Sequence, residues 1–206
     1  TFGITILLLA MQNPILVAEN AASLDWITNG NYVLGVGLGY RPEEFEALGV
    51  KFEQRVSRFE EAIPLIRRLW NEESVTHHGQ HFNVSGLGAS IKPKRAGGPP
   101  IWVGGDVIAA VQRAAKLNCP WIAPPTMTFH EIAERVEVYR KASAEISGNS
   151  VNEQPIIREV AIGSTKAEAL RAARPALLSK YESYASWGQT ATKGQVSLSD
   201  TFDEFI

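Results

Sequence analysis

The fold is decided by the stretch Tyr32-Val33-Leu34-Gly35-Val36-Gly37-Leu38-Gly39-Tyr40-Arg41. Residues 32–38 form a short apolar run rich in β-branched and aromatic side chains, which predicts a buried strand. Gly35, Gly37 and Gly39 take every second position, so one face of that strand carries no side chains. Bare backbone of this kind is typical of a close approach by a flat ligand or by another backbone segment.

Three interpretations of these glycines are open. A dinucleotide-binding fingerprint requires Gly-x-Gly-x-x-Gly, whereas the spacing here is Gly-x-Gly-x-Gly and Tyr-Arg-Pro follows. The glycines could instead serve tight packing inside a barrel or sheet. A cofactor could also lie across the carboxyl end of the strand, where the aromatic Tyr40 and the basic Arg41 follow. The spacing disfavours the first interpretation, and we favour the third.

Composition and charge narrow the class of protein. The chain has 206 residues, of which 45% are hydrophobic and 20% are charged, with a net charge of -2. These values are ordinary for a globular protein and, without a basic run, argue against binding to nucleic acid or to anionic membranes. The apolar run 4–11 is too short to span a bilayer. The single cysteine, Cys119, fits a small core residue in a reducing compartment, so we expect a cytoplasmic protein.

Apolar runs alternate with helical patterns along the chain. Strands are predicted, besides that at 32–38, at 3–11, 101–103, 121–123 and 156–162. Helices are predicted at 14–28, 42–48, 52–70, 107–117, 128–147 and 165–188. Short links between strand and helix are typical of βαβ units with parallel strands, and we expect the strand at 3–11 to be buried on both faces.

Helix starts carry recognisable caps. Asn13 can cap a helix that Pro14 opens. Two pairs match the capping-box pattern: Thr128 with Glu131, and Thr165 with Glu168.

Two features inside the helices are also informative. Pro64 predicts a kink or break near Glu60, and Pro175 predicts an interruption of the last helix. The four arginines of the helix at 52–70 are interpreted as a solvated face rather than a phosphate patch: Arg55, Arg58, Arg67 and Arg68.

A second glycine pair marks the end of the strand at 101–103. Gly104 and Gly105 are followed by Asp106, which we expect to cap a helix beginning at Val107. Free N–H groups at a helix start after glycines form an anion-binding corner, so a phosphate could bind there. Simple capping is the alternative.

Residues 74–84 predict a small hairpin that turns at Gly79. It carries His77, His78 and His81, which raises the question of a metal site. Adjacent histidines on a strand point to opposite faces, and no acidic or cysteine partner is near in sequence. We therefore interpret them as structural or exposed histidines and expect no metal.

The strand count sets the architecture. A closed (β/α)8 barrel needs eight strands and about 250 residues. This chain supplies five predicted strands and one hairpin, with long apolar strands at both outer edges, which natural sheets avoid. We therefore expect an α/β fold in one domain, residues 1–206, that is a central piece of a longer chain.

Several motifs in order carry a resemblance to a known family. They are Asn13-Pro14, Ala18-Glu19-Asn20-Ala21-Ala22-Ser23-Leu24-Asp25, Leu34 to Arg41, Glu44-Phe45-Glu46-Ala47-Leu48-Gly49-Val50 with Arg55, Arg58-Phe59-Glu60-Glu61, Arg67-Arg68-Leu69-Trp70, Pro99-Pro100-Ile101-Trp102-Val103-Gly104-Gly105 and Arg113-Ala114-Ala115. Together they resemble the luciferase-like flavin-dependent oxidoreductases and monooxygenases (bacterial luciferase type), over essentially the whole chain. The resemblance implies a partial TIM-type (β/α)8 barrel, about strands 3 to 7 with a small β-hairpin insertion. By this resemblance we expect the given sequence to lack the first two strands, which usually carry much of the substrate pocket and an active-site histidine, and the last strand.

The resemblance also implies cofactor-binding residues for FMN or the deazaflavin coenzyme F-420. Gly39, Tyr40 and Arg41 would border the flavin and its phosphate. Residues 104–107 would line the ring and ribityl chain: Gly104, Gly105, Asp106 and Val107. The remaining implied positions are Thr126 and Thr128, where longer deazaflavin tails bind, and Asn13. A non-proline cis bond is expected at Ile4-Thr5 or Gly3-Ile4. The family often has Arg where Leu38 stands.

The function implied is hydride transfer by a reduced flavin or deazaflavin, or oxygenation of a small organic substrate with reduced FMN. No catalytic acid or base is assigned; Arg41 is the candidate for charge stabilisation, whereas Glu43 and Glu44 suit a helix start. An NAD(P)H:flavin reductase could be a partner, and the resemblance implies a homodimer. The alternatives are a non-catalytic flavin-binding shortened barrel and an inactive fragment.

Overall fold

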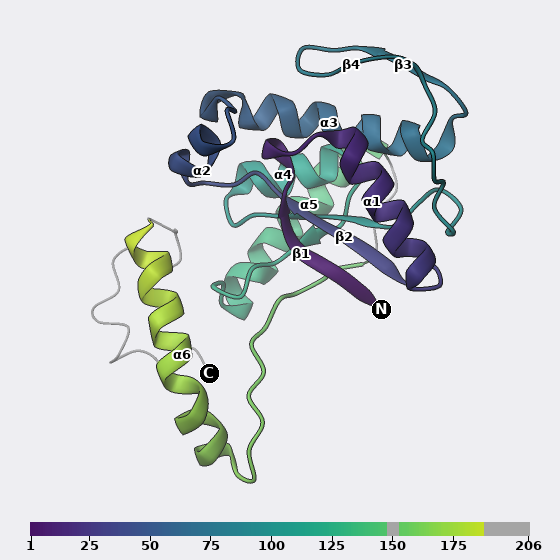
Figure 1. Ribbon diagram of the computed structural model, residues 1–206. Coiled ribbons are helices and arrows are strands. Elements are labelled where there is room, and N and C mark those ends of the chain that lie inside the picture. The colour runs from purple at the N-terminus through teal and green to yellow at the C-terminus, as the bar shows by residue number, and fades with distance from the viewer. Residues whose placement is uncertain (148–152, 188–206) are drawn as a thin grey trace.

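The computed structural model describes residues 1–147 and 153–187 (Figure 1). A parallel sheet with the strand order β1-β2-β5-β6 forms its centre. The strands are β1 (Phe2–Leu8), β2 (Tyr32–Gly37), β5 (Ile101–Gly104) and β6 (Trp121–Ile122). The helices are α1 (Pro14–Ile27), α2 (Pro42–Ala47), α3 (Arg55–Asn71), α4 (Ile108–Lys116), α5 (Phe129–Ser147) and α6 (Lys166–Ser186). Short 3₁₀ turns cover Leu9–Met11 and Phe52–Gln54.

The parallel sheet with helices between its strands is the predicted partial barrel, and within the described residues it does not close. β2 is buried throughout and pairs with β1 on one side and β5 on the other. A separate antiparallel hairpin, β3 (Val75–His78) with β4 (Asn83–Leu87), lies beside α3. It was predicted as the insertion.

Local signals place most helix ends where the sequence predicts them. The Asn13 side chain accepts a hydrogen bond from the Ile15 amide at 2.9 Å and so caps α1. That helix ends before Asn29 and Gly30, whose positive φ angles of 56° and 78° reverse the chain. Thr165 caps α6 by accepting from the amide of the glutamate three residues later. The predicted capping boxes are therefore confirmed as caps.

The first strand differs from its prediction. It ends at Leu8, and residues 9–11 form a 3₁₀ turn rather than more strand. The expectation of burial on both faces is wrong, since the Phe2 side chain is 68% exposed and Ile4 is 39% exposed. The reason is that, within the described residues, β1 has a neighbouring strand only on its β2 side.

The predicted strand at 156–162 does not form. Its sole pairing among the described residues is a single parallel bridge between Ala123 and Ile156. Beyond that bridge Val160 and Ile162 are 83% and 91% exposed. An extended segment becomes a strand only when a neighbour accepts its hydrogen bonds, and here the segment leads away from the sheet to α6 (Figure 1).

The prolines do not break their helices. α3 runs unbroken through Pro64, and α6 runs unbroken through Pro175. Both prolines lie on exposed helix faces, so each ring points away from the core. Each helix therefore loses only the one backbone hydrogen bond that the missing proline N–H would donate. Of the predicted kink or break near Glu60, the break is therefore wrong, and so is the predicted interruption at Pro175.

Two of the four arginines of α3 join it to other elements rather than forming a solvated face. Arg58 Nε donates to the Ala10 carbonyl at 2.9 Å, and Arg67 donates to the carbonyls of Leu117 and Asn118 at 2.6 and 2.8 Å. These bonds join α3 to the turn after β1 and to the turn after α4. Sequence spacing cannot show this, because the acceptors lie about 50 positions away.

No helix in the described ranges is long and apolar enough to cross a membrane. The sequence is polar from residue 189 and predicts no further strand there, and this segment lies outside the described residues.

Candidate functional site

The carboxyl ends of the parallel strands meet at one edge of the sheet. Leu8 pairs with Gly37, and Gly104 pairs with Ile122, so the segments that leave these strands begin side by side. Nine of the predicted site residues lie at or beyond the carboxyl ends of β2, β5 or β6: Gly39, Tyr40, Arg41, Gly104, Gly105, Asp106, Val107, Thr126 and Thr128. The fold therefore brings these three segments to the edge where parallel α/β proteins bind ligands.

The bare face of β2 is filled by β1. A side chain at Gly35 would collide with the carbonyl oxygen of Ile4, and a Cβ at Gly37 would lie 2.9 Å from Ile6 Cγ2. A Cβ at Gly104 would collide with the same Ile6 side chain. Gly35 and Gly37 thus support the packing interpretation, which leaves the segments beyond the strand ends as the candidate ligand-facing part.

Ile6 was missed by sequence reasoning, although its side chain touches both β2 and β5 at the glycine positions. Its apolar character was visible, but nothing local indicates which neighbouring glycines it covers. A non-proline cis peptide lies between Thr5 and Ile6. The expected positions, Ile4-Thr5 or Gly3-Ile4, are therefore wrong, although the stretch is right.

The segment after β2 is held tightly. Gly39 has φ +83°, and a Cβ there would lie 2.7 Å from Met11 Cε, so glycine is required. Arg41 precedes α2 and bonds Glu44 at 3.1 Å, with Glu43 at 3.7 Å. Its Nε is buried and has no hydrogen-bond partner in the described part of the chain. Such an atom is a donor available to a ligand that carries oxygen acceptors.

Tyr40 stands beside this arginine and is 41% exposed. Burial raises the pKa of the Tyr40 phenol; Tyr184 and Glu44 add to the rise, and Arg41 acts in the opposite direction. The phenol is therefore protonated at neutral pH and can donate a hydrogen bond.

The corner after β5 is also a constrained turn. Gly105 has φ +155°, a Cβ there would lie 2.5 Å from Ala110 Cβ, and its carbonyl accepts from Trp121 Nε1 at 2.7 Å. The predicted cap at Asp106 is wrong: α4 has Val107 as its N-cap residue, with no side-chain cap bond. The first turn of α4 contains no acidic residue, which suits an anion at the helix start.

The remaining predicted residues are less free to bind. Thr126 is buried behind the end of β6. The Thr128 hydroxyl donates to Glu131 Oε2 at 2.8 Å and accepts from its amide at 3.2 Å, so it serves the start of α5. Asn13 is engaged in the cap of α1. Residues 39–41 and 104–107 therefore remain as the candidate site.

Two of the three histidines of the hairpin contact side chains of α3. His77 Nε2 lies 3.0 Å from Glu61 Oε1, and His81 Nε2 lies 2.7 Å from Ser57 Oγ. Among the described residues, no group of three or more metal-ligating side chains is placed to hold an ion. Burial raises the pKa of the Cys119 thiol to about 11, which fits its predicted core role.

Comparison with known proteins adds to this geometry. The profile of the family described as luciferase-like monooxygenase matches residues 1–200. A curated relative is the phthiodiolone/phenolphthiodiolone dimycocerosates ketoreductase of Mycobacterium kansasii, 30% identical over 145 residues, which cover 69% of this chain and 39% of the relative. The chain thus spans about two fifths of the length of that relative.

Two solved structures share the fold. The first is the oxygenating constituent of 3,6-diketocamphane monooxygenase from Pseudomonas putida in complex with FMN, a type II Baeyer-Villiger monooxygenase. It matches with a TM-score of 0.74 and 19% identity over 100% of this chain and 63% of that chain. The second is an F420-dependent secondary alcohol dehydrogenase in complex with an F420-acetone adduct. Its TM-score is 0.70 with 19% identity over 84% of this chain and 53% of that chain.

Proposed function

Because the chain belongs to the luciferase-like monooxygenase family, we propose that it carries the cofactor-binding part of a flavin- or deazaflavin-dependent oxidoreductase. The activity belongs to the protein as a whole: hydride transfer to or from a small organic substrate, or its oxygenation. Solved structures with the same fold contain FMN or an F420 adduct, so both cofactors are candidates.

One observation carries the proposal. The segments at residues 39–41 and 104–107 leave adjacent parallel strands at the same edge, although they are separated by more than sixty positions in sequence. One segment contributes a guanidinium with an unpartnered buried Nε. The other contributes a glycine turn and a helix start without acidic residues. An anionic group on a flat cofactor fits between a cation and helix N–H groups.

Each residue at this edge of the sheet would have a different role in binding the cofactor. Arg41 would neutralise phosphate charge, Tyr40 would donate a hydrogen bond, and the turn at Gly104 and Gly105 would lie against the ring system. Ile6 would form the apolar floor, since its side chain covers the glycines of β2 and β5. When bound, FMN or F-420 supplies the redox chemistry, as hydride transfer or, with reduced FMN, activation of oxygen.

Further parts of the proposal concern partners. The substrate is a small organic molecule, and an NAD(P)H:flavin reductase would supply reduced FMN if FMN is the cofactor. We also propose a homodimer in the cytoplasm. The alternative function is a flavin-binding protein without turnover, which has the same edge but no complete substrate pocket. An inactive fragment is the remaining alternative.

The test is a fluorescence titration of the purified chain with FMN and with F-420. Any side chain at Gly105 would meet Ala110, so a blocking group is better placed at Val107, which is 47% exposed. The blocking variant is Val107→Trp. Ile27→Trp is the matched control, because Ile27 is 79% exposed at the far end of α1.

We expect binding of one cofactor by the wild type and by Ile27→Trp, and loss of at least tenfold in affinity in Val107→Trp. Equal affinity in all three proteins would contradict the location at this edge. No binding to the wild type would contradict the proposal that this chain carries the site by itself. Binding without turnover of any substrate would favour the flavin-binding alternative.

A further inference from the structure

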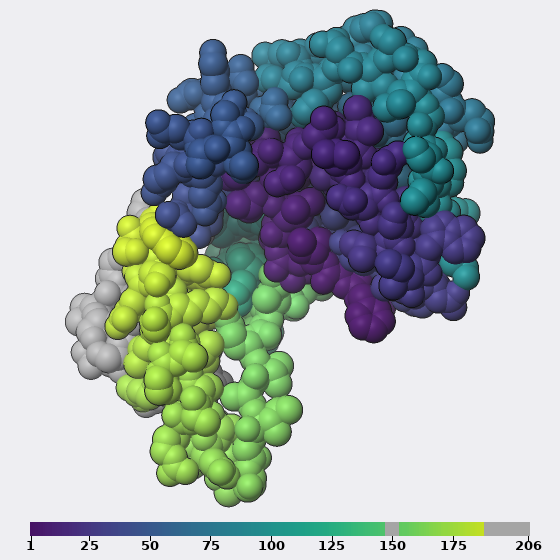
Figure 2. Space-filling view, viewed as in Figure 1, coloured from purple at the N-terminus to yellow at the C-terminus, as the bar shows by residue number. Residues whose placement is uncertain are grey.

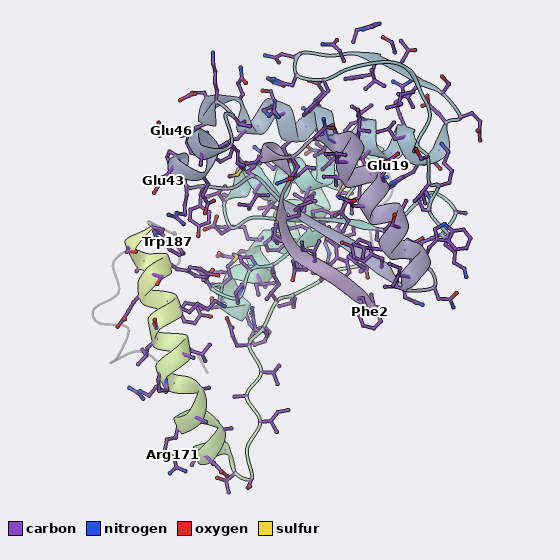
Figure 3. The ribbon with its side chains drawn as sticks, in the orientation of Figure 1. Phe2, Glu19, Glu43, Glu46, Arg171 and Trp187 are labelled. Atoms are coloured by element: carbon purple, nitrogen blue, oxygen red, sulfur yellow. The ribbon has the colours of Figure 1, made fainter. Side chains whose placement is uncertain are left out.

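The end of α6 lies against the candidate site. Trp187, directly after α6, places its ring 4.9 Å from Arg41 Cζ and 6.4 Å from the Tyr40 ring. Tyr184 packs on Trp187 at 6.0 Å between ring centroids. Figure 3 shows Trp187 at the end of α6 nearest Glu43, and Figure 2 shows the same end touching the surface of α2.

This contact is one attachment of α6 to the rest of the described chain, and a second lies one to two turns earlier in the helix. The other is formed by Glu159, whose carboxylate lies 2.5 Å from Lys180 Nζ and accepts from the Tyr181 hydroxyl at 3.0 Å. Of the residues in α6, all within the described range, only Tyr181 is buried. An exposed helix with small attachments at its far half can leave the surface at low cost.

The contact with Trp187 occupies the guanidinium that the ligand needs. One face of Arg41 is covered by Trp187, and its edge is held by Glu44 and Glu43. Arg41 Nε has no partner among the described residues, but it is buried, so a phosphate can reach it only if a group that covers Arg41 moves. The stacking of a partly exposed tryptophan on arginine is weak, whereas a phosphate makes charge-assisted, often bidentate bonds to the same group. We therefore expect the phosphate to displace Trp187 from Arg41.

We propose that Trp187 is a gate on the cofactor site, and that a phosphate-bearing ligand binds Arg41 by displacing Trp187 and releasing the end of α6. The gate makes the site selective for ligands whose phosphate can compete with it. This inference rests on the proposed function, because it places the phosphate of that cofactor at Arg41. Neither Trp187 nor Tyr184 was singled out by sequence reasoning, since each lies more than 140 positions from Arg41.

The experiment compares FMN with riboflavin, which has the same ring and no phosphate. Removing the gate in Trp187→Ala should tighten FMN binding about two- to fivefold, the size expected for one exposed cation–π contact, and leave riboflavin binding unchanged. Trp26→Ala is the matched control: Trp26 is 54% exposed and lies 5.3 Å from Lys94 Nζ. It should change neither affinity. Weaker FMN binding in Trp187→Ala, or equal changes for both flavins, would overturn the gate.

A second measurement separates this gate from the proposed function. Failure of the proposed function would appear as no binding of either flavin to any variant. Hydrogen exchange at residues 180–187 is then measured with inorganic pyrophosphate against sodium chloride of equal ionic strength. The gate predicts faster exchange with pyrophosphate in the wild type, and fast exchange in Trp187→Ala with either salt. Exchange that pyrophosphate does not alter in the wild type would overturn the gate.

Discussion

At the scale of single residues, Glu61 fastens the β3–β4 hairpin to α3. Its carboxylate is 13% exposed and accepts from the amides of His81 and Phe82 at 3.0 and 2.9 Å, in addition to its contact with His77. This arrangement accounts for the positions of His77 and His81 in the turn. The sequence shows no acidic neighbour, because Glu61 approaches from another element.

Replacing this carboxylate should destabilise the fold. Glu61→Gln keeps the shape but loses the charge that strengthens these hydrogen bonds, so we expect a loss of about 1–3 kcal/mol in the free energy of unfolding. Urea denaturation at pH 7 measures it. The control is Glu46→Gln, because Glu46 is exposed on α2 and should be neutral. An equal effect of both substitutions would contradict the fastening role.

The Glu61 carboxylate also makes the free energy of unfolding depend on pH, and the sign of that dependence follows from its pKa shift. Burial alone would raise the pKa of Glu61, but the hydrogen bonds from His77, Phe82 and His81 outweigh it, and the pKa lies below its ordinary value of 4.5. A lowered folded-state pKa contributes stability above the unfolded value and loses it as the pH falls through the folded value. The stability difference between wild type and Glu61→Gln should therefore be constant near pH 7 and shrink below about pH 4.5. A difference that grows on acidification would contradict this account.

At the scale of elements, α3 shows how packing overrides a local signal. Its inward face contains a dense set of buried residues: Phe59, Ala62, Ile63, Leu65, Ile66, Leu69 and Trp70. Trp70 Nε1 also donates to the Ala18 carbonyl of α1 at 2.9 Å. These contacts hold the helix continuous through Pro64, whose ring faces solvent.

The exposed proline should nevertheless weaken this helix. Pro64→Ala restores one backbone donor without touching the core, so we expect an increase of about 1–3 kcal/mol in the free energy of unfolding. The increase would be seen as a higher midpoint in thermal unfolding followed by circular dichroism. A lower midpoint would mean that the geometry imposed by Pro64 is needed to seat α3 on α1.

At the scale of the whole molecule, the sheet is open at the β1 side. β1 exposes apolar side chains along a strand edge, which is a template for pairing with another chain. We expect the isolated 206-residue chain to self-associate, and Phe2→Lys to reduce the apparent mass in analytical ultracentrifugation. Ile27→Lys adds the same charge at an exposed helical position and should not. Equal masses for wild type and Phe2→Lys would show that this edge is not the contact.

The sequence by itself determined the order of β and α elements, most helix ends and the edge that carries the candidate site. These features depend on local signals: apolar periodicity, caps at Asn13 and Thr165, and glycines that only certain turns require. Such signals say which face of an element is buried, but they do not say what covers it.

Only the tertiary structure decided which residues from distant parts of the chain contact one another. It placed Ile6 over the glycines of β2 and β5, Glu61 beneath the hairpin and Trp187 on Arg41, each pair brought together from distant parts of the chain. It also decided that residues 156–162 form no strand, although their pattern suits one. The physical reason is the same in each case: a strand, a packed side chain or an ion pair needs a neighbour, and the neighbour is supplied by the fold rather than by the adjacent sequence.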